Sequence, residues 1–304
     1  MKDILSLIEL GRESFERVIA ESALLKARRK AGIQEDCCRG KTLGMYFEKP
    51  SLRTRVSLET AMNSLGGSAV CLEADSPNRF WARESVRDQA RVMSRFVDFV
   101  AMRTFSHAVI EEFSRESSVP IINVLSDHSH PTQVIADFLT FGEYCGKLEG
   151  KTLAYFGDGN NVARSLLAAA ALTGVRLVWS GPPGYRLEPS YVGTVRKVAG
   201  KIDFVEEPDP FKAVARADVI YTDVWASMGQ EADAARREKE FMPYQVNGRL
   251  LAAAPGEAVV MHCLPAHRGS EITDEVLDGG RSAVYDQAEN RMHVYRGIFS
   301  LLSQ

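Results

Sequence analysis

The chain has 304 residues, of which 45% are hydrophobic and 25% charged, with a formal net charge of -3. This length exceeds one ordinary hydrophobic core, so it predicts two domains. The small negative charge gives no electrostatic basis for binding nucleic acid or a membrane surface, and any anion-binding site must therefore be local.

Short apolar runs alternate with helix-period stretches along most of the chain, a pattern typical of βαβ units. The predicted strands are 42–47, 69–72, 99–102, 121–124, 152–156, 175–179, 219–221, 259–261 and 283–285. We predict an α/β protein of two domains, each a parallel sheet flanked by helices, with the active site in the interdomain cleft.

The predicted domain boundary follows a helix that ends near Gly146. Residues 1–147 form the expected first domain and 148–288 the second, while a C-terminal helix at 289–304 packs back on the first. Two segments without a regular pattern, 75–83 and 230–240, are expected to act as lids.

Nothing in the chain indicates secretion or a membrane. The N-terminal segment contains acidic residues and has no long apolar core, and no later apolar run could span a bilayer. Five scattered cysteines suit a reducing compartment without disulfides. We expect a cytoplasmic protein without a metal site, because no His/Cys cluster has metal-ligand spacing.

The turn Ser51-Leu52-Arg53-Thr54-Arg55 leads from a strand into a helix. Unpaired N–H groups, the positive end of the helix dipole and the hydroxyl and guanidinium donors make such a turn suitable for phosphate. Two arginines two residues apart cannot share a helical face. We expect Arg53 to meet the ligand and Arg55 to pair within the protein. A capped helix with surface ion pairs is the alternative.

Arg103, His130 and Gln133 follow two other predicted strands of the first half. His130 precedes Pro131 at a helix start, and Gln133 lies on the same face one turn later. Hydrogen bonds from these side chains could polarise a carbonyl oxygen and hold an amide nitrogen. His130 alone fits a polar helix cap equally well.

In the second half, Gly157-Asp158-Gly159-Asn160-Asn161 links a strand to a helix. A dinucleotide-binding fold is disfavoured, because Val162 replaces the third glycine and the next strand ends without an acidic residue. Asn161 could instead hold a carboxylate at the helix start.

Two further strand ends carry reactive groups. Asp223, followed four residues later by Ser227, could bind an ammonium group, or Asp223 could cap a helix. Cys263 ends an apolar strand next to His262, which points to the opposite face and so cannot activate the thiol. Cys263 either orients a substrate amine or is a buried, inert thiol.

These segments, in this order, resemble ornithine carbamoyltransferases over nearly the whole chain. The resemblance implies transfer of a carbamoyl group from carbamoyl phosphate to L-ornithine by a homotrimer or a multiple of trimers, with no cofactor, in arginine biosynthesis. It implies that Arg103, His130 and Cys263 are catalytic. The implied carbamoyl phosphate residues are Ser51, Leu52, Arg53, Thr54, Arg103, His130, Gln133, Arg291 and, from a neighbouring subunit, Arg79; the implied ornithine residues are Asn161, Asp223, Ser227, Met228, Cys263 and Leu264.

Two positions depart from the family pattern. Leu52 stands where a threonine is usual, so only its backbone can bind phosphate, and Trp81 replaces a usual glycine. Trp81 could shape a pocket for N-acetyl- or N-succinyl-ornithine or another amine, or it could pack at a subunit interface. A non-catalytic paralogue that binds a phosphate metabolite is the alternative of another class.

Overall fold

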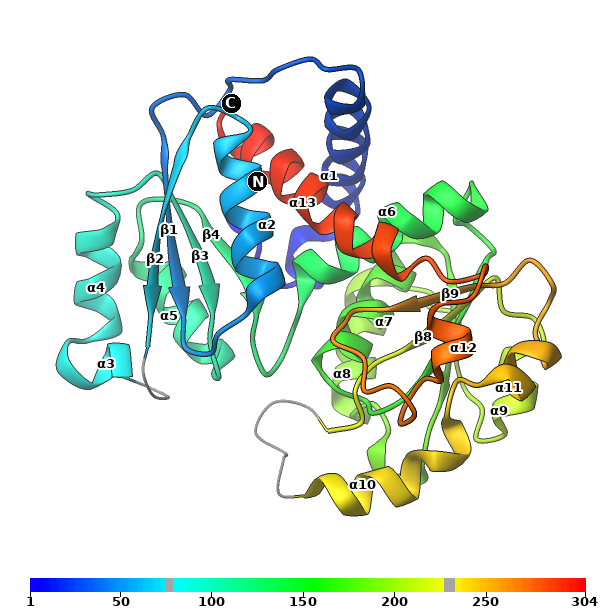
Figure 1. Ribbon diagram of the computed structural model, residues 1–304. Coiled ribbons are helices and arrows are strands. Elements are labelled where there is room, and N and C mark those ends of the chain that lie inside the picture. Colours follow the sequence, from blue (N-terminus) through cyan, green and yellow to red (C-terminus); the bar gives the residue numbers. More distant parts are fainter. Residues whose placement is uncertain (75–78, 227–232) are drawn as a thin grey trace. The chain divides into compact units, whose positions relative to one another are not determined.

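The computed structural model describes residues 1–74, 79–226 and 233–304, with the side chain of Arg79 left out (Figure 1). The chain divides into two compact units, Met1–Leu139 with Glu289–Gln304, and Thr140–Ala288. Each unit is built on one parallel sheet flanked by helices, which confirms the predicted fold class.

The first unit contains a four-stranded parallel sheet in the order β2-β1-β3-β4. Its strands are β1 Thr42–Phe47, β2 Ser68–Glu73, β3 Phe99–Arg103 and β4 Ile121–Leu125. Its helices are α1 Leu7–Lys30, α2 Leu52–Asn63, α3 Arg79–Arg83, α4 Val86–Met93 and α5 His107–Glu116, together with the first part of α6 Pro131–Cys145 and most of α13 Val284–Leu302.

Side chains alternate between the two faces of this sheet. On one face, Tyr46 and Met102 pack with Ile110 and Phe113 of α5 in a buried cluster. On the other, the ring of Phe99 lies 5.6 Å from that of Phe299 in α13. Both faces are therefore covered, as a buried parallel sheet requires.

Helices α1 and α13, from opposite ends of the chain, lie side by side in this unit (Figure 1). Arg296 donates from Nη1 to the carbonyl oxygen of Leu25 at 2.8 Å. A Cβ atom at Gly297 would lie 2.3 Å from Ser22 Oγ, so only glycine permits this close approach. The approach joins the C-terminal helix to the N-terminal one.

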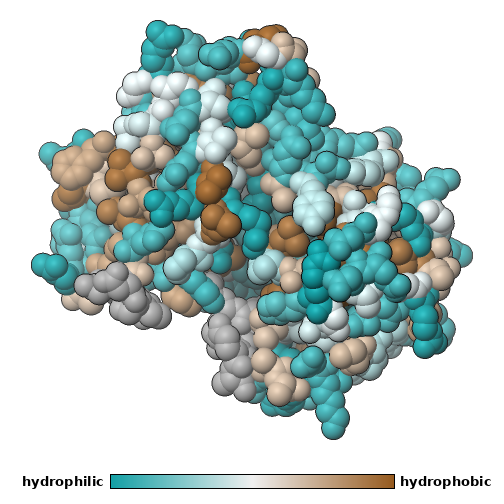
Figure 2. Space-filling model, viewed as in Figure 1, coloured by the Kyte–Doolittle hydropathy of each residue, from teal (hydrophilic) through white to brown (hydrophobic). Residues whose placement is uncertain are grey.

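Hydrophobic side chains remain exposed on the outer surface of α2 and β2. Figure 2 shows apolar colour on the surface over α2, where Leu52 is 78% and Val56 51% exposed. Val70 of the edge strand β2 is 52% exposed. Leu52 and Val56, four residues apart on α2, share one face of that helix, and exposed apolar side chains grouped in this way are typical of protein–protein contacts.

The second unit contains a five-stranded parallel sheet in the order β7-β6-β5-β8-β9. Its strands are β5 Thr152–Phe156, β6 Arg176–Ser180, β7 Phe204–Glu206, β8 Val219–Thr222 and β9 Val259–His262. Its helices are α7 Asn161–Thr173, α8 Pro189–Ala199, α9 Pro210–Val214, α10 Ala234–Phe241, α11 Gly248–Ala253 and α12 Asp274–Leu277, with 3-10 turns at Pro183–Tyr185 and Met242–Tyr244.

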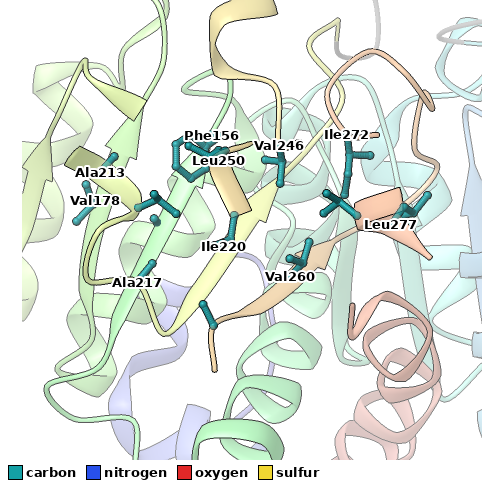
Figure 3. Close-up of a cluster of buried hydrophobic side chains, with 14 of the residues drawn as sticks. Phe156, Val178, Ala213, Ala217, Ile220, Val246, Leu250, Val260, Ile272 and Leu277 are labelled. Carbon is teal, nitrogen blue, oxygen red and sulfur yellow. The ribbon is translucent and has the colours of Figure 1, made fainter. Parts of the chain in front are cut away.

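One face of this second sheet carries a continuous apolar core. Phe156, Ile220 and Val260, from three adjacent strands, pack with Leu250 of α11 and Leu277 of α12 (Figure 3). Burial of such side chains contributes about 1.5–3 kcal/mol each. The core fixes the strands whose carboxyl ends carry Asp158, Asp223 and Cys263.

One predicted strand was wrong, and one strand was not predicted. Residues 283–285 are not a strand: Ala283 N–H bonds to Val260, but Val284 begins the helix α13. Strand β7 was not predicted, because three residues are too few for a visible alternation. Two segments predicted without a regular pattern are partly helical: Ala234–Phe241 forms α10 and Arg79–Arg83 forms α3, while 230–232 and 75–78 lie outside the described ranges. That these segments act as lids stays a prediction.

Candidate active site

The turn after β1 is built as its sequence predicts. Ser51 is the N-cap residue of α2, and its hydroxyl donates to Thr54 Oγ1 at 2.9 Å. Arg291 Nη2 donates to the same Thr54 oxygen at 2.6 Å. Arg55 pairs with Glu59 and Glu73 at 3.0 and 2.7 Å, which confirms that it binds within the protein.

Three guanidinium groups gather beside this turn. Burial, followed by the nearby charges of Arg291 and Arg53, lowers the pKa of Arg103 to about 10. Arg291 is 4% exposed. Like charges held together in a buried place are costly unless an anion joins them, so this cluster is a strong anion-binding arrangement.

His130 and Gln133 lie at the start of α6 in the same unit. Burial, followed by the charges of Arg291 and Arg103, holds the pKa of His130 well below its usual value. His130 is therefore neutral and offers one ring N–H as donor. Gln133 Nε2 donates to Asp137 at 2.8 Å, while Gln133 Oε1 has no hydrogen-bond partner among the described residues. A buried amide oxygen of this kind can accept a ligand N–H.

The loop that presents His130 has its own scaffold, which sequence reasoning missed. The buried Asn123 side chain donates to the carbonyl oxygen of Leu5 at 2.8 Å and to Ser126 Oγ at 3.3 Å. Ser129 N–H donates to the same hydroxyl at 3.2 Å. An asparagine inside an otherwise apolar strand was the available signal, because a buried amide must find partners.

In the second unit, Asp223 links two strand ends to the start of α7. Its Oδ1 accepts from Cys263 Sγ at 2.9 Å, and its Oδ2 accepts from Asn160 Nδ2 at 2.9 Å. Asn160 is the N-cap residue of α7 and accepts from Val162 N–H and Ala163 N–H, and the predicted site residue Asn161 is the first residue of that helix. The structure thus brings Asp223 and Cys263 together and adds Asn160.

A buried ion pair lies next to this group. Arg237 of α10 donates to Asp158 Oδ2 at 2.6 Å and to the carbonyl oxygen of Trp225 at 2.9 Å, and its guanidinium lies 4.7 Å from the Tyr185 ring centre. Burial raises the pKa of Asp158, while Arg237 opposes that rise. Sequence reasoning missed Arg237, which is 79 residues from its partner.

Gly159 shows why this loop requires glycine. A Cβ atom there would lie 2.5 Å from the backbone carbon of Arg186. Any side chain would push the loop away from Arg186, and with it Asp158 and Asn160 on either side. The glycine therefore fixes the place of two polar side chains in the site.

His262 has a supporting role beside Cys263. Its Nδ1 accepts from Leu264 N–H at 2.8 Å, so the proton sits on Nε2, which lies 3.0 Å from Glu271 Oε1. The expectation that His262 does not activate the thiol is consistent with this pairing. Leu264 has φ 55, an uncommon conformation for a residue other than glycine, at a cost of about 1–3 kcal/mol. The bond to His262 holds that conformation.

Three predicted site residues lie, entirely or with their side chains, outside the part of the chain that the structure describes. Ser227 and Met228 lie outside the described residues, and so does the side chain of Arg79. Within the described ranges, no group of three His, Cys, Asp or Glu side chains is arranged to hold a metal ion, and no helix is long and apolar enough to cross a membrane.

Comparison with known proteins agrees with this geometry. The family model for the carbamoyl-P binding domain of aspartate/ornithine carbamoyltransferase matches residues 2–143, and the model for its Asp/Orn binding domain matches residues 149–302. The chain belongs to the aspartate/ornithine carbamoyltransferase family.

Individual relatives cover almost all of this carbamoyltransferase-family chain. The ornithine carbamoyltransferases of Archaeoglobus fulgidus and Methanoculleus marisnigri are 50% and 48% identical to it, each over 98% of the chain and over 96% and 95% of the relative. The solved structure of ornithine carbamoyltransferase from Pyrococcus furiosus superposes with a TM-score of 0.94 at 44% identity, covering 99% of this chain and 96% of that one.

Proposed function

We propose that this carbamoyltransferase-family protein transfers the carbamoyl group of carbamoyl phosphate to the δ-amine of L-ornithine, giving citrulline and phosphate. The observation that carries the proposal is the cluster of Arg53, Arg103 and Arg291 around a neutral His130, because such a cluster needs a dianion. The near-full-length relatives are ornithine carbamoyltransferases, which favours ornithine as the acceptor.

In this proposal, the first unit binds carbamoyl phosphate. The phosphate meets the α2 turn and the nearest guanidinium groups, while the carbamoyl end meets the donors at β3 and α6. Residues 1–147 with 289–304 would form this domain, and 148–288 the amino-acid domain. The phosphate residues are Ser51, Leu52 through its N–H, Arg53, Thr54, Arg291 and a neighbouring subunit's Arg79; the carbamoyl residues are Arg103, His130 and Gln133.

The second unit would bind ornithine. Asp223 offers a carboxylate to an ammonium group, and Asn160 and Cys263 hold that carboxylate in place. The thiol and the Leu264 carbonyl oxygen would lie beside the δ-amine. The α-amino and α-carboxylate groups would be bound by Asn161, Asp223, Ser227 and Met228.

The reaction requires the neutral δ-amine to reach the carbamoyl carbon. Arg103 and His130 would stabilise the oxyanion that forms when nitrogen attacks. The C–O bond to phosphate then breaks, and the departing phosphate takes the proton that the amine loses. A free amine has a pKa near 10, so we expect the rate to rise with pH above neutrality.

We also propose a cytoplasmic homotrimer, or a multiple of trimers, that acts in arginine biosynthesis. The exposed apolar side chains of Leu52 and Val56 support a subunit contact next to the phosphate turn. A site completed by a neighbouring subunit's Arg79 needs such closed symmetry. Sedimentation analysis would test the trimer.

The test of function is turnover with a panel of acceptors. Ornithine, N-acetylornithine, N-succinylornithine and putrescine are each supplied with carbamoyl phosphate, and the carbamoylated products are quantified. We expect product with ornithine and its loss in Arg53→Ala. Faster turnover of an acylated ornithine would reject ornithine as the substrate, and no turnover with any acceptor would favour the non-catalytic paralogue.

A further inference from the structure

Trp81, where the family usually has glycine, is held inside the first unit. Its indole ring stacks on Tyr46 with centroids 5.9 Å apart and an interplanar angle of 21°. Phe80 packs edge-on against the same tyrosine at 5.1 Å. Gln89 donates from Nε2 to the carbonyl oxygens of Phe80 and Glu84. Helix α3 is therefore anchored to the end of β1.

The indole N–H of Trp81 has a specific acceptor. It donates to Glu48 Oε1 at 2.7 Å, and Glu48 is 4% exposed. The second carboxylate oxygen, Oε2, accepts from Phe105 N–H at 2.8 Å. Each oxygen of this buried carboxylate thus has a donor, and the Trp81 bond fixes how the carboxylate is turned.

Glu48 contacts the backbone at the last residue of β3 and two residues after it. Its own N–H donates to the carbonyl oxygen of Arg103 at 2.9 Å, while its carboxylate holds Phe105 two residues further on. Arg103 is the residue that needs such support, because the charges of Arg291 and Arg53 act on it. A guanidinium repelled by its neighbours keeps its place only if its backbone is fixed.

We infer that Glu48 and Trp81 are positioning residues for Arg103 and set the affinity for carbamoyl phosphate. The indole N–H orients the Glu48 carboxylate, which fixes the turn after Arg103 and so the guanidinium. Trp81 then acts neither as the wall of an acceptor pocket nor as a subunit contact. The inference rests on the proposed role of Arg103 in binding carbamoyl phosphate.

The matched test compares Trp81→Phe with Trp179→Phe. Both changes replace an indole with a phenyl ring, but Trp179 is buried in the second unit and its Nε1 has no partner among the described residues. We expect Trp81→Phe to raise the KM for carbamoyl phosphate and the Kd for inorganic phosphate about fivefold, since it leaves a buried carboxylate oxygen unpaired. The KM for ornithine stays unchanged, and Trp179→Phe changes none of these values.

A double-mutant cycle with Glu48→Gln tests the path through Glu48. A glutamine can accept from only one of the two donors, so its amide N–H faces the other. Removing the indole N–H relieves that conflict. If the two changes acted independently, the Kd of the double variant Glu48→Gln/Trp81→Phe for phosphate would rise by the product of the two single fold-changes. We expect a Kd about threefold or more below that product.

Two results would overturn the inference. One is an unchanged KM for carbamoyl phosphate in Trp81→Phe, and the other is an equal rise for both substrates, which would indicate general loosening. The variant Arg103→Gln distinguishes failure of this inference from failure of the proposed phosphate site. If Arg103→Gln loses phosphate binding while Trp81→Phe does not, only the inference fails; if Arg103→Gln binds phosphate normally, the proposed site itself is wrong.

Discussion

The replacement of Arg237 by methionine tests the electrostatics of the second unit. Arg237 and Asp158 are 7% and 8% exposed, and their side chains meet at 2.6 Å. Methionine fills much of the same volume without charge. The change leaves Asp158 buried without its cation, beside Asp223, whose charge already raises the pKa of Asp158.

Protonation of Asp158 limits how far Arg237→Met can destabilise the folded state. Breaking a buried pair costs about 3–5 kcal/mol. Asp158 can avoid part of that cost by taking a proton, and its ordinary pKa is 3.8. At pH 7 that proton costs about 4.4 kcal/mol, from about 1.4 kcal/mol for each pH unit above 3.8. We therefore expect Arg237→Met to lower the free energy of unfolding by about 3–4 kcal/mol at pH 7.

The sign of the pH dependence follows from linkage. In the variant the folded-state pKa of Asp158 is raised above its unfolded value, so above pH 3.8 the folded state holds a proton that the unfolded state releases. Stability then falls as pH rises, and the penalty is absent below the unfolded pKa. Between pH 5 and pH 7 the penalty should grow by up to about 2.7 kcal/mol.

Urea unfolding at several pH values measures this directly. The double variant Arg237→Met/Asp158→Asn lacks the titrating carboxylate. Its free energy of unfolding relative to wild type should therefore not show the pH dependence expected for Arg237→Met alone. Arg236→Met, which removes an exposed partner of Asp233, is the matched control and should have little effect. A penalty for Arg237→Met that does not change between pH 5 and pH 7 would refute the argument, because the destabilisation would then not arise from a buried carboxylate.

Two further predictions concern ligands. Phosphate at about 100 times its Kd should stabilise the wild-type protein by about 2.7 kcal/mol, and an unshifted unfolding curve under those conditions would argue against a folded-state site. Cys263→Ala should raise the KM for ornithine about fivefold and Cys263→Ser less, since serine keeps a donor to Asp223; equal effects in steady-state kinetics would show that this bond does not matter.

The parts of the site that were predictable from sequence are local. The α2 turn carries its donors within five consecutive residues, and the pairing of Arg55 away from Arg53 follows from helix geometry alone. The strand ends at Arg103 and Asp223 follow from the rule that parallel strands gather functional groups at their carboxyl ends. Residue patterns within a few positions are enough to predict these features.

The parts that were missed depend on contacts between residues that are distant in sequence or on how far strand pairing extends. Asn160 was not predicted as a site residue, because the Asp223 carboxylate to which it donates lies 63 residues further along the chain. Arg237 lies in a stretch that appeared to be a charged loop, although its side chain is buried against Tyr185 and Asp158. Residues 283–285 have strand composition, yet pairing at a single bridge is too little to extend a sheet.

The net charge of -3 conceals two sites of opposite polarity. The first unit concentrates guanidinium groups around Thr54 and His130, where a dianion would replace mutual repulsion with attraction. Among the described residues of the second unit, Asp223 lies next to Asp158; Arg237 pairs with Asp158, whereas Asp223 accepts from the neutral donors Cys263 and Asn160. A carboxylate supported by neutral donors keeps its charge available for a cation. Each unit thus favours a substrate of one sign, as a reaction between an acyl phosphate and a diamino acid requires.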